Sequence, residues 1–381
     1  MKISQDIRYV GASRESEDLF EGLYKVPCGM AYNSYVICDE QPVVMDTIEQ
    51  ELGDEWLENV EKQLEGKAPA YLVVQHMEPD HSANVQRLLQ RYPQTTVVAN
   101  SKTFAMLNNF FPRLQCNKKE VADGERLCTG RHTLRFIFAP MVHWPEVMVT
   151  YDEKDEVLFS ADAFGKFGSL CRNQPWEEEA ARYYFGIVGK YGVQVQALLK
   201  KASALSIKAI CPLHGPVLSD NLQKYLSLYD VWSRYGVEKQ GVLVAYTSVY
   251  GHTRAAARLL ADTLADMVVP VEVYDLARCD EYEAVSKAFR YGKIALATTT
   301  YNMQIFPAMR QFLSHLTDRN FQNRKVAVIE NGSWAPCAAK LITQALEGCK
   351  NVEILPAVTL RSAMTEQNVG QIKQLAQLLA Q

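Results

Sequence analysis

Residues 71–85 read Tyr-Leu-Val-Val-Gln-His-Met-Glu-Pro-Asp-His-Ser-Ala-Asn-Val. The apolar run Tyr71–Val74 predicts a buried strand, and the apolar residues from Val85 onward recur at helical spacing. The turn between them holds four potential metal ligands, His76, Glu78, Asp80 and His81. A polar loop that caps a helix is the alternative, but four ligand-type side chains within six positions favour a metal site.

Three more candidate ligands each follow an apolar strand, as His76 does: His143, Asp162 and His214. A lone loop histidine is more often structural than catalytic, so the interpretation rests on the shared placement of these residues. Active sites gather where strand ends open onto loops over a rigid scaffold, and this placement therefore predicts one site. His132 and His315 lack that context and are interpreted as structural or surface residues.

The composition excludes several classes of protein. The 381 residues, 48% hydrophobic and 22% charged, are typical of a globular protein of two or three domains. A net charge of −4 without a long basic run argues against a nucleic-acid partner. No 18-residue apolar stretch and no signal-peptide core is present, so we expect no membrane association. Nine scattered cysteines without a Cys-x-x-Cys pair indicate reduced thiols in a cytoplasm and argue against a cysteine-ligated metal.

The second half of the chain has a different pattern. After the polar stretch Ser233–Gln240, strand-like and helix-like segments alternate to the C-terminus. The expected strands are Gly241–Tyr246, Val271–Tyr274, Lys293–Ala297, Lys325–Ile329 and Val352–Leu355. Such alternation predicts a doubly wound, parallel, five-stranded sheet, which binds ligands beyond the carboxyl ends of its strands. We expect this α/β domain to span residues 240–381.

Three loops at those strand ends are candidate cofactor-binding segments. They comprise Thr247, Ser248, Val249, Tyr250, Gly251, His252 and Thr253; Thr299, Thr300, Tyr301 and Asn302; and Asn331, Gly332, Ser333 and Trp334. Hydroxyls and free N–H groups at a helix N-terminus predict a phosphate site in the first loop, although an ordinary capped helix is the alternative. Neither a nucleoside-triphosphate nor a dinucleotide motif is present. The loop resembles the flavodoxin phosphate loop, which holds FMN, and Tyr301 or Trp334 is available to stack on a flavin or to serve a subunit interface.

The ordered ligand set resembles that of the metallo-β-lactamase fold, and specifically its flavodiiron branch. The hydrolase branch carries His-x-His-x-Asp-His in the first loop, whereas this chain has His76-x-Glu78-x-Asp80-His81. The resemblance implies an αββα sandwich over roughly residues 1–236. It also implies that His76, Glu78 and His143 bind one iron, that Asp80, His81 and His214 bind the other, and that Asp162 bridges them.

The chemistry of these side chains independently favours iron over zinc. Three carboxylates and four imidazoles without a thiolate suit iron or manganese. The negative charge of Glu78, where the hydrolases have histidine, favours the more oxidised metal, and zinc has no redox chemistry.

The resemblance implies an oxidoreductase. FMN would take electrons from a rubredoxin-type or other external donor and pass them to two irons, which reduce dioxygen to water, nitric oxide to nitrous oxide, or both. It also implies a head-to-tail homodimer or a dimer of dimers, in which the flavin of one chain meets the irons of the other. A binuclear metallohydrolase with a regulatory flavin domain is the alternative. A third, non-enzymatic hypothesis is an electron-carrying or redox-sensing flavoprotein with a structural metal.

Overall fold

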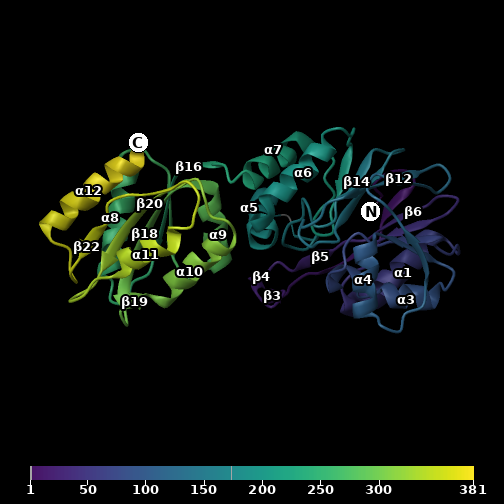
Figure 1. Cartoon of the computed structure of the whole chain (residues 1–381), viewed down its shortest axis with the longest axis horizontal. Coiled ribbons are helices and arrows are strands. Elements are labelled where there is room, and N and C mark those ends of the chain that lie inside the picture. The colour runs from purple at the N-terminus through teal and green to yellow at the C-terminus, as the bar shows by residue number, and fades with distance from the viewer. Residues whose placement is uncertain (1, 173) are drawn as a thin grey trace. The chain divides into compact units, whose positions relative to one another are not determined.

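The computed structural model describes residues 2–172 and 174–381, which divide into two compact units (Figure 1). The N-terminal unit comprises Met1–Tyr184 and Val193–Tyr229, and the C-terminal unit comprises Phe185–Gly192 and Asp230–Gln381. Within the described residues, no helix has both the length and the apolar character that crossing a membrane requires.

The N-terminal unit is built on two sheets packed face to face. One has the strand order β1-β6-β7-β8-β9-β10, with bounds Ile7–Tyr9, Tyr35–Ile37, Val43–Met45, Tyr71–Val73, Thr96–Ala99 and Asn117–Glu120. The other has the order β11-β12-β13-β14-β15, with bounds Arg126–Cys128, Thr133–Phe138, Met148–Asp152, Val157–Phe159 and Ala209–Cys211. The short pairs β2–β5 and β3–β4 span Ala12–Arg14 with Met30–Tyr32, and Leu19–Phe20 with Tyr24–Lys25.

Helices cover both outer faces of this sandwich. Figure 1 shows α1, α3 and α4 grouped on one side of its strands and α5, α6 and α7 on the other. The helices are α1 Gly53–Leu64, α2 Pro79–Ser82, α3 Val85–Arg91, α4 Ser101–Phe110, α5 Trp176–Tyr183, α6 Gly192–Ala202 and α7 Leu222–Ser233. Side chains of both sheets, such as Val73, Phe136 and Phe159, share one buried core. The expected αββα sandwich is confirmed.

The C-terminal unit is a doubly wound sheet with the order β17-β16-β18-β20-β21. Its strands are β16 Lys239–Tyr246, β17 Val271–Asp275, β18 Tyr291–Tyr301, β19 Gln304–Ile305, β20 Arg324–Asn331, β21 Val352–Ile354 and β22 Val358–Leu360. Its helices are α8 His252–Asp266, α9 Glu281–Arg290, α10 Pro307–Asp318, α11 Ala338–Leu346 and α12 Glu366–Ala380. This is the flavodoxin-like order 2-1-3-4-5. The fifth sheet position is divided between β21 and β22, which both pair with β20, and β19 adds a short antiparallel strand.

Residues outside 240–381 complete the C-terminal unit. The ring of Phe185 stacks on that of Phe289 at 4.9 Å. The guanidinium of Arg324, buried at the start of β20, donates hydrogen bonds to the carbonyl oxygens of Tyr235 at 2.8 Å and Gly236 at 3.0 Å. These contacts anchor the segment before β16 to the sheet, because an unsatisfied buried cation would be costly.

We therefore expect a fragment of residues 240–381 to be less stable than a fragment of residues 230–381. The shorter fragment removes two acceptors of the buried Arg324 side chain. Arg324 keeps its contacts with the carbonyl oxygens of Phe289 and Asn323. A hydrogen bond of a charged group is worth about 1.5–3 kcal/mol, so losing two of them should lower the midpoint of thermal unfolding by more than roughly 3 °C. Circular-dichroism melts of the two fragments measure this difference, and equal midpoints would contradict it.

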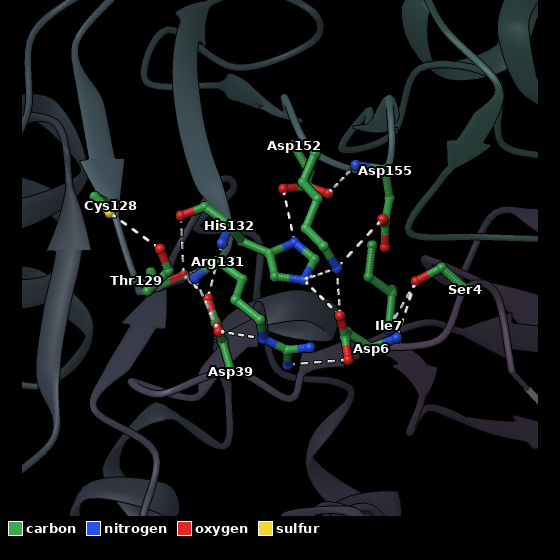
Figure 2. Close-up of polar contacts among 12 residues, drawn as sticks. Ser4, Asp6, Ile7, Asp39, Cys128, Thr129, Arg131, His132, Asp152 and Asp155 are labelled. Atoms are coloured by element: carbon green, nitrogen blue, oxygen red, sulfur yellow. Dashed lines mark hydrogen bonds and ion pairs between the residues drawn. The ribbon is translucent and has the colours of Figure 1, made fainter.

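A network of charged side chains ties Asp6, near the N-terminus, to the two turns that carry His132 and Lys154 in the N-terminal unit (Figure 2). His132 Nδ1 lies 2.9 Å from Asp152 and its Nε2 lies 3.2 Å from Asp6. The ammonium group of Lys154 contacts the Asp6 carboxylate and lies 3.2 Å from His132 Nε2. Asp6, His132 and Asp155 are near enough to one another to hold a metal, but Lys154 supplies the cation there. His132 therefore has a structural role.

This network gives a pH-dependent contribution to stability. Burial alone would lower the pKa of His132, but its hydrogen bonds with Asp152 and Asp6 raise it. A raised folded-state pKa means that the stabilisation is complete below the unfolded pKa of about 6.5 and is lost as pH rises through the folded value. The difference in melting temperature between the wild type and His132→Gln should thus be larger at pH 6 than at pH 9. A difference that grows with pH would show that the sign is wrong.

Candidate metal centre and cofactor pocket

The structure brings all seven candidate metal ligands to one end of the sandwich. His76 and Glu78 follow β8, Asp80 and His81 lie in α2, and His143, Asp162 and His214 follow β12, β14 and β15. They form two groups, within each of which the ligand atoms lie within 4.8 Å of one another: His76, Glu78, His143 and Asp162, and Asp80, His81 and His214. Residues more than 60 positions apart meet here because the two packed sheets bring the end of β8 close to the ends of β12, β14 and β15.

Asp162 lies between the two groups. Its Oδ2 atom is 3.0 Å from His143 Nε2 and 3.3 Å from His76 Nε2. Its Oδ1 atom is 3.1 Å from His81 Nε2 and 3.8 Å from His214 Nε2. Each oxygen of this buried carboxylate therefore faces a different group, which is the geometry of a bridging ligand.

The other two carboxylates each belong to one group. Glu78 Oε2 lies 3.2 Å from His76 Nε2 and 3.0 Å from His143 Nε2. Asp80 Oδ2 lies 3.3 Å from His81 Nε2 and 3.2 Å from His214 Nε2. In both groups the Nε2 atoms and one carboxylate oxygen thus converge on a shared point.

Several of these converging atoms have no hydrogen bond that accounts for their burial. Both carboxylate oxygens of Asp80, Oδ1 of Asp162 and Nε2 of His81 are buried and form no hydrogen bond with the described residues. Buried polar atoms are nearly always satisfied, so atoms of this kind call for a ligand. Four imidazoles and three carboxylates fit two metal ions with mixed nitrogen and oxygen ligation. The ring of His81 lies 4.7 Å from that of His214 and belongs to this convergent set.

Protons and metal compete for the same atoms. Burial alone would lower the pKa of His143, but its hydrogen bonds to Asp162 and Glu78 raise it to about 9. Burial would likewise lower the pKa of His214, and its contact with Asp80 raises it. Metal binding must displace these protons, because a protonated imidazole has no lone pair to give.

Residues that the sequence did not single out surround the ligands. Glu146 Oε1 lies 2.8 Å from His76 Nδ1, and the Ala31 carbonyl oxygen lies 2.7 Å from His214 Nδ1. Asp46 accepts hydrogen bonds from the main-chain and side-chain nitrogens of Gln75 at 2.7 and 2.8 Å. For Glu146 and Asp46, the only sequence signal was an acidic residue beside an apolar strand. The Ala31 carbonyl oxygen belongs to the backbone, so no residue type in the sequence could have indicated its role.

Aromatic rings pack around the metal ligands. The His214 ring contacts Phe20 at 5.4 Å, Tyr32 at 5.7 Å and Tyr183 at 5.5 Å between ring centroids. The ring of Trp144 meets that of His76 edge-on at 5.3 Å. These contacts hold the imidazoles in place and exclude water from their outer sides.

The three loops predicted to bind a cofactor line one cavity of about 670 Å³ in the C-terminal unit. This volume lies within the range usual for cofactor sites. All the residues singled out in these loops line it except Thr247 and Gly251. Thr247 is fully buried, and its Oγ1 atom lies 2.7 Å from Thr298 Oγ1. Gly251 directly precedes α8 and adopts a left-handed backbone conformation with φ +95°. Ala335, which directly follows Trp334 in the third loop, also lines the cavity, and so do Met303 and Ser362, which had no sequence signal.

The cavity has the features that FMN requires. The N-terminus of α8 carries no side-chain cap, so its first N–H groups are available to a phosphate. Thr253 Oγ1 lies 3.1 Å from Thr299 Oγ1 beside that terminus. Both aromatic residues predicted to stack on a flavin line the cavity, Tyr301 at 47% and Trp334 at 83% exposure. Tyr250, which is 91% exposed, is a third aromatic ring available there.

Thr300 has a different part in this site. Its Oγ1 atom accepts hydrogen bonds from the main-chain nitrogens of Cys337 at 2.9 Å and Ala338 at 3.2 Å. It thereby ties the second loop to the start of α11, and its hydroxyl serves the shape of the cavity.

Comparisons with known proteins match both units. A model described as ODP family beta lactamase matches residues 30–215, and a flavodoxin domain model matches residues 243–347. The anaerobic nitric oxide reductase flavorubredoxin of Vibrio vulnificus is 27% identical over 345 residues, which cover 87% of this chain and 70% of that protein.

Two solved structures are similar over the whole chain. The flavodiiron protein from Giardia intestinalis superposes with a TM-score of 0.93 at 25% identity, covering 100% of this chain and 95% of that one. The rubredoxin oxygen:oxidoreductase of the anaerobe Desulfovibrio gigas gives a TM-score of 0.93 at 24% identity, covering 100% and 97%.

Proposed function

The chain belongs to the flavodiiron protein family, and from this premise we propose that it reduces dioxygen to water, nitric oxide to nitrous oxide, or both. It is an oxidoreductase whose cofactors are FMN and two iron ions per chain. When bound, FMN exchanges electrons singly or in pairs, and the irons supply one-electron redox chemistry where the gas binds. The names of the relatives include both a nitric oxide reductase and an oxygen oxidoreductase, which supports keeping both gases.

The observation that carries the proposal is the position of Asp162 between the two ligand groups. One buried carboxylate with each oxygen facing a different trio of ligands suits a pair of metals. Two-metal sites usually hold their ions about 3.5–4 Å apart. We assign His76, Glu78 and His143 to one iron, Asp80, His81 and His214 to the other, and Asp162 to both.

The protein residues around this centre have distinct tasks. Glu146 and the Ala31 carbonyl hold the Nδ1 protons of His76 and His214, which turns the Nε2 lone pairs toward the metals. The rings of Phe20, Tyr32 and Tyr183 keep water away from His214. The hydroxyls and the uncapped helix start around Thr253 hold the phosphate of FMN.

The remaining elements of the proposal concern assembly. We propose that residues 1–236 serve as the diiron domain and 240–381 as the FMN domain, that a separate rubredoxin-type or other protein supplies electrons, and that the enzyme works in the cytoplasm. The working unit is a head-to-tail homodimer or a dimer of such dimers. The family resemblance and the short stretch Ser233–Gln240 support this arrangement.

Gas consumption by the reduced protein tests the activity. Purified protein with two irons and one FMN should consume dioxygen or nitric oxide when a chemical reductant keeps the flavin reduced. Elemental analysis accompanies the measurement. A protein that carries only zinc and hydrolyses esters or lactams without consuming either gas would instead be the metallohydrolase.

Complementation tests the sharing of sites between chains. We expect a mixture of Asp162→Ala, which lacks metal, with Thr253→Glu, which lacks flavin, to regain gas reduction once subunits exchange. Each mixed dimer then contains one complete site, so at most about half of its sites recover. Mass spectrometry of the native complexes reports the mixed dimers. Inactive mixed dimers would place the flavin and the irons of a working site within one chain.

A further inference from the structure

Glu146 is a fully buried residue whose carboxylate contacts the candidate ligand His76 on the side of its ring that faces away from the metal centre. Its Oε1 atom is 2.8 Å from Nδ1 of His76 and accepts the N–H of Met77 at 2.9 Å. The opposite nitrogen of the His76 ring faces Glu78 and Asp162 at 3.2 and 3.3 Å. An acceptor at Nδ1 therefore leaves the Nε2 lone pair for a metal, since a neutral imidazole carries one proton.

The hydrogen bonds of Glu146 fit its ionised form. Oε1 accepts from the Met77 N–H and is in contact with the His76 ring nitrogen. Oε2 is buried and makes no hydrogen bond with any described residue. A protonated carboxyl group would need an acceptor for its hydroxyl, and none of the described residues supplies one at Oε2. Glu146 thus adds a negative charge close to His76.

The backbone of Glu146 is fixed from a third segment. The side chain of Asn100 donates a hydrogen bond to the Glu146 carbonyl oxygen at 2.6 Å. Asn100 is itself the N-cap of α4, where its Oδ1 accepts the N–H of Thr103 at 3.0 Å. The capped helix α4 therefore holds Glu146 in place opposite His76. Because Glu146 is itself held, it orients the His76 ring more firmly than a mobile carboxylate would.

No carboxylate among the described residues accepts a hydrogen bond from Nδ1 of His81 or His214 in the second group of ligands. Nδ1 of His214 meets the carbonyl oxygen of Ala31 at 2.7 Å, which is a neutral acceptor. Nδ1 of His81 is buried and forms no hydrogen bond with the described residues. The two ligand groups thus differ in the acceptors at their imidazole Nδ1 atoms, and the buried charge of Glu146 acts strongly on His76 because the surroundings screen it little.

We propose that Glu146 is a positioning residue that makes the two metal positions unequal. It fixes the tautomer of His76 and strengthens metal binding and the ferric state at the position formed by His76, Glu78 and His143. A ferric ion carries one more positive charge than a ferrous ion, so a nearby negative charge favours it. The inference rests on the proposed function, because it concerns the irons of that same site.

The test compares Glu146→Gln with the wild-type holoprotein. Glutamine keeps the size and an acceptor oxygen for His76 but removes the charge. Under a chelator, we expect one of the two irons to be lost about 10–100-fold more readily than in the wild type, while the other behaves as before. We also expect the ferric/ferrous midpoint potential to rise, as followed by electron paramagnetic resonance during a reductive titration.

The matched control is Asp152→Asn. The pair His132 Nδ1–Asp152 Oδ1, at 2.9 Å with both side chains 0% exposed, is the same kind of buried imidazole–carboxylate contact in the same unit (Figure 2). It lies outside the metal centre, so its loss should change neither iron release nor the potential. An equal effect of the two variants would reduce the role of Glu146 to general stability and overturn the proposal.

Two other outcomes also overturn the proposal: unchanged iron release with an unchanged potential in Glu146→Gln, or an equal loss of both irons. If that variant does not fold, Glu146→Asp replaces it, since aspartate keeps the charge but draws back from Nδ1. The loss of iron should again be one-sided, though smaller, and a symmetrical or absent loss contradicts the proposal. If the two irons differ in release and Glu146→Gln shifts the potential as expected, but the protein reduces neither dioxygen nor nitric oxide, the proposed function is contradicted and the inference about Glu146 stands.

Discussion

Asp162→Ala is expected to remove both irons and, with them, the reduction of dioxygen or nitric oxide. The side chain is 1% exposed, and its two oxygens face separate ligand groups at 3.0–3.1 Å from the nearest imidazole nitrogens. Loss of a contact that only orients a ligand typically costs 10–100-fold in metal affinity or activity, so loss of a shared ligand should cost more than about 100-fold. Elemental analysis and gas consumption measure the two effects.

The control for this variant is Asp123→Ala. The Asp123 side chain is 48% exposed and pairs with Lys201 at 2.9 Å on the surface of the same unit. Its removal deletes one carboxylate without touching the centre, so iron content and activity should match the wild type. Asp162→Ala protein that keeps two irons would show that Asp162 is not a shared ligand.

Thr253→Glu is expected to abolish FMN binding while leaving iron in place. The hydroxyl of Thr253 lies beside the uncapped start of α8, where the FMN phosphate is assigned. A carboxylate about 4 Å from a phosphate charge costs about 4 kcal/mol near a protein surface, or roughly 1,000-fold in affinity. Thr253→Ala removes only a hydrogen bond to a charged group, worth about 1.5–3 kcal/mol, and should weaken binding less. Titration of the flavin-free protein with FMN, followed by flavin fluorescence, measures both.

The same exchange further along α8 provides the comparison. The Thr263 hydroxyl donates to the Leu259 carbonyl oxygen at 2.7 Å within the helix. At 1.5 Å rise per residue, it lies about 15 Å from Thr253. Thr263→Glu should therefore bind FMN as the wild type does. Equal FMN affinity in all three variants would move the phosphate site away from this loop.

The sequence was sufficient where the signal is local. Apolar runs of four to six residues, such as Tyr71–Val74, predict strands because burial requires such runs, and each of the six strands predicted above begins within two residues of its expected position. The short strands β19 and β22 had no such prediction. The four ligand-type residues from His76 to His81 predict a metal site because they are close along the chain. The alternation of strands and helices after residue 240 likewise predicts a parallel sheet, since each strand must return by a crossover.

Contacts between distant segments depended on packing. That Glu146 lies behind His76, 70 positions earlier, follows from the placement of β8 beside the loop before β13, which no spacing encodes. The same reason explains why Phe185 and the carbonyl groups of Tyr235 and Gly236 complete the C-terminal unit. Residue type and local spacing report which groups are able to bind a metal or a phosphate. The division of the other six ligands into two groups around Asp162 arises only when two sheets bring four strand ends and the loops after them to one edge, because tertiary packing sets the distances between these side chains.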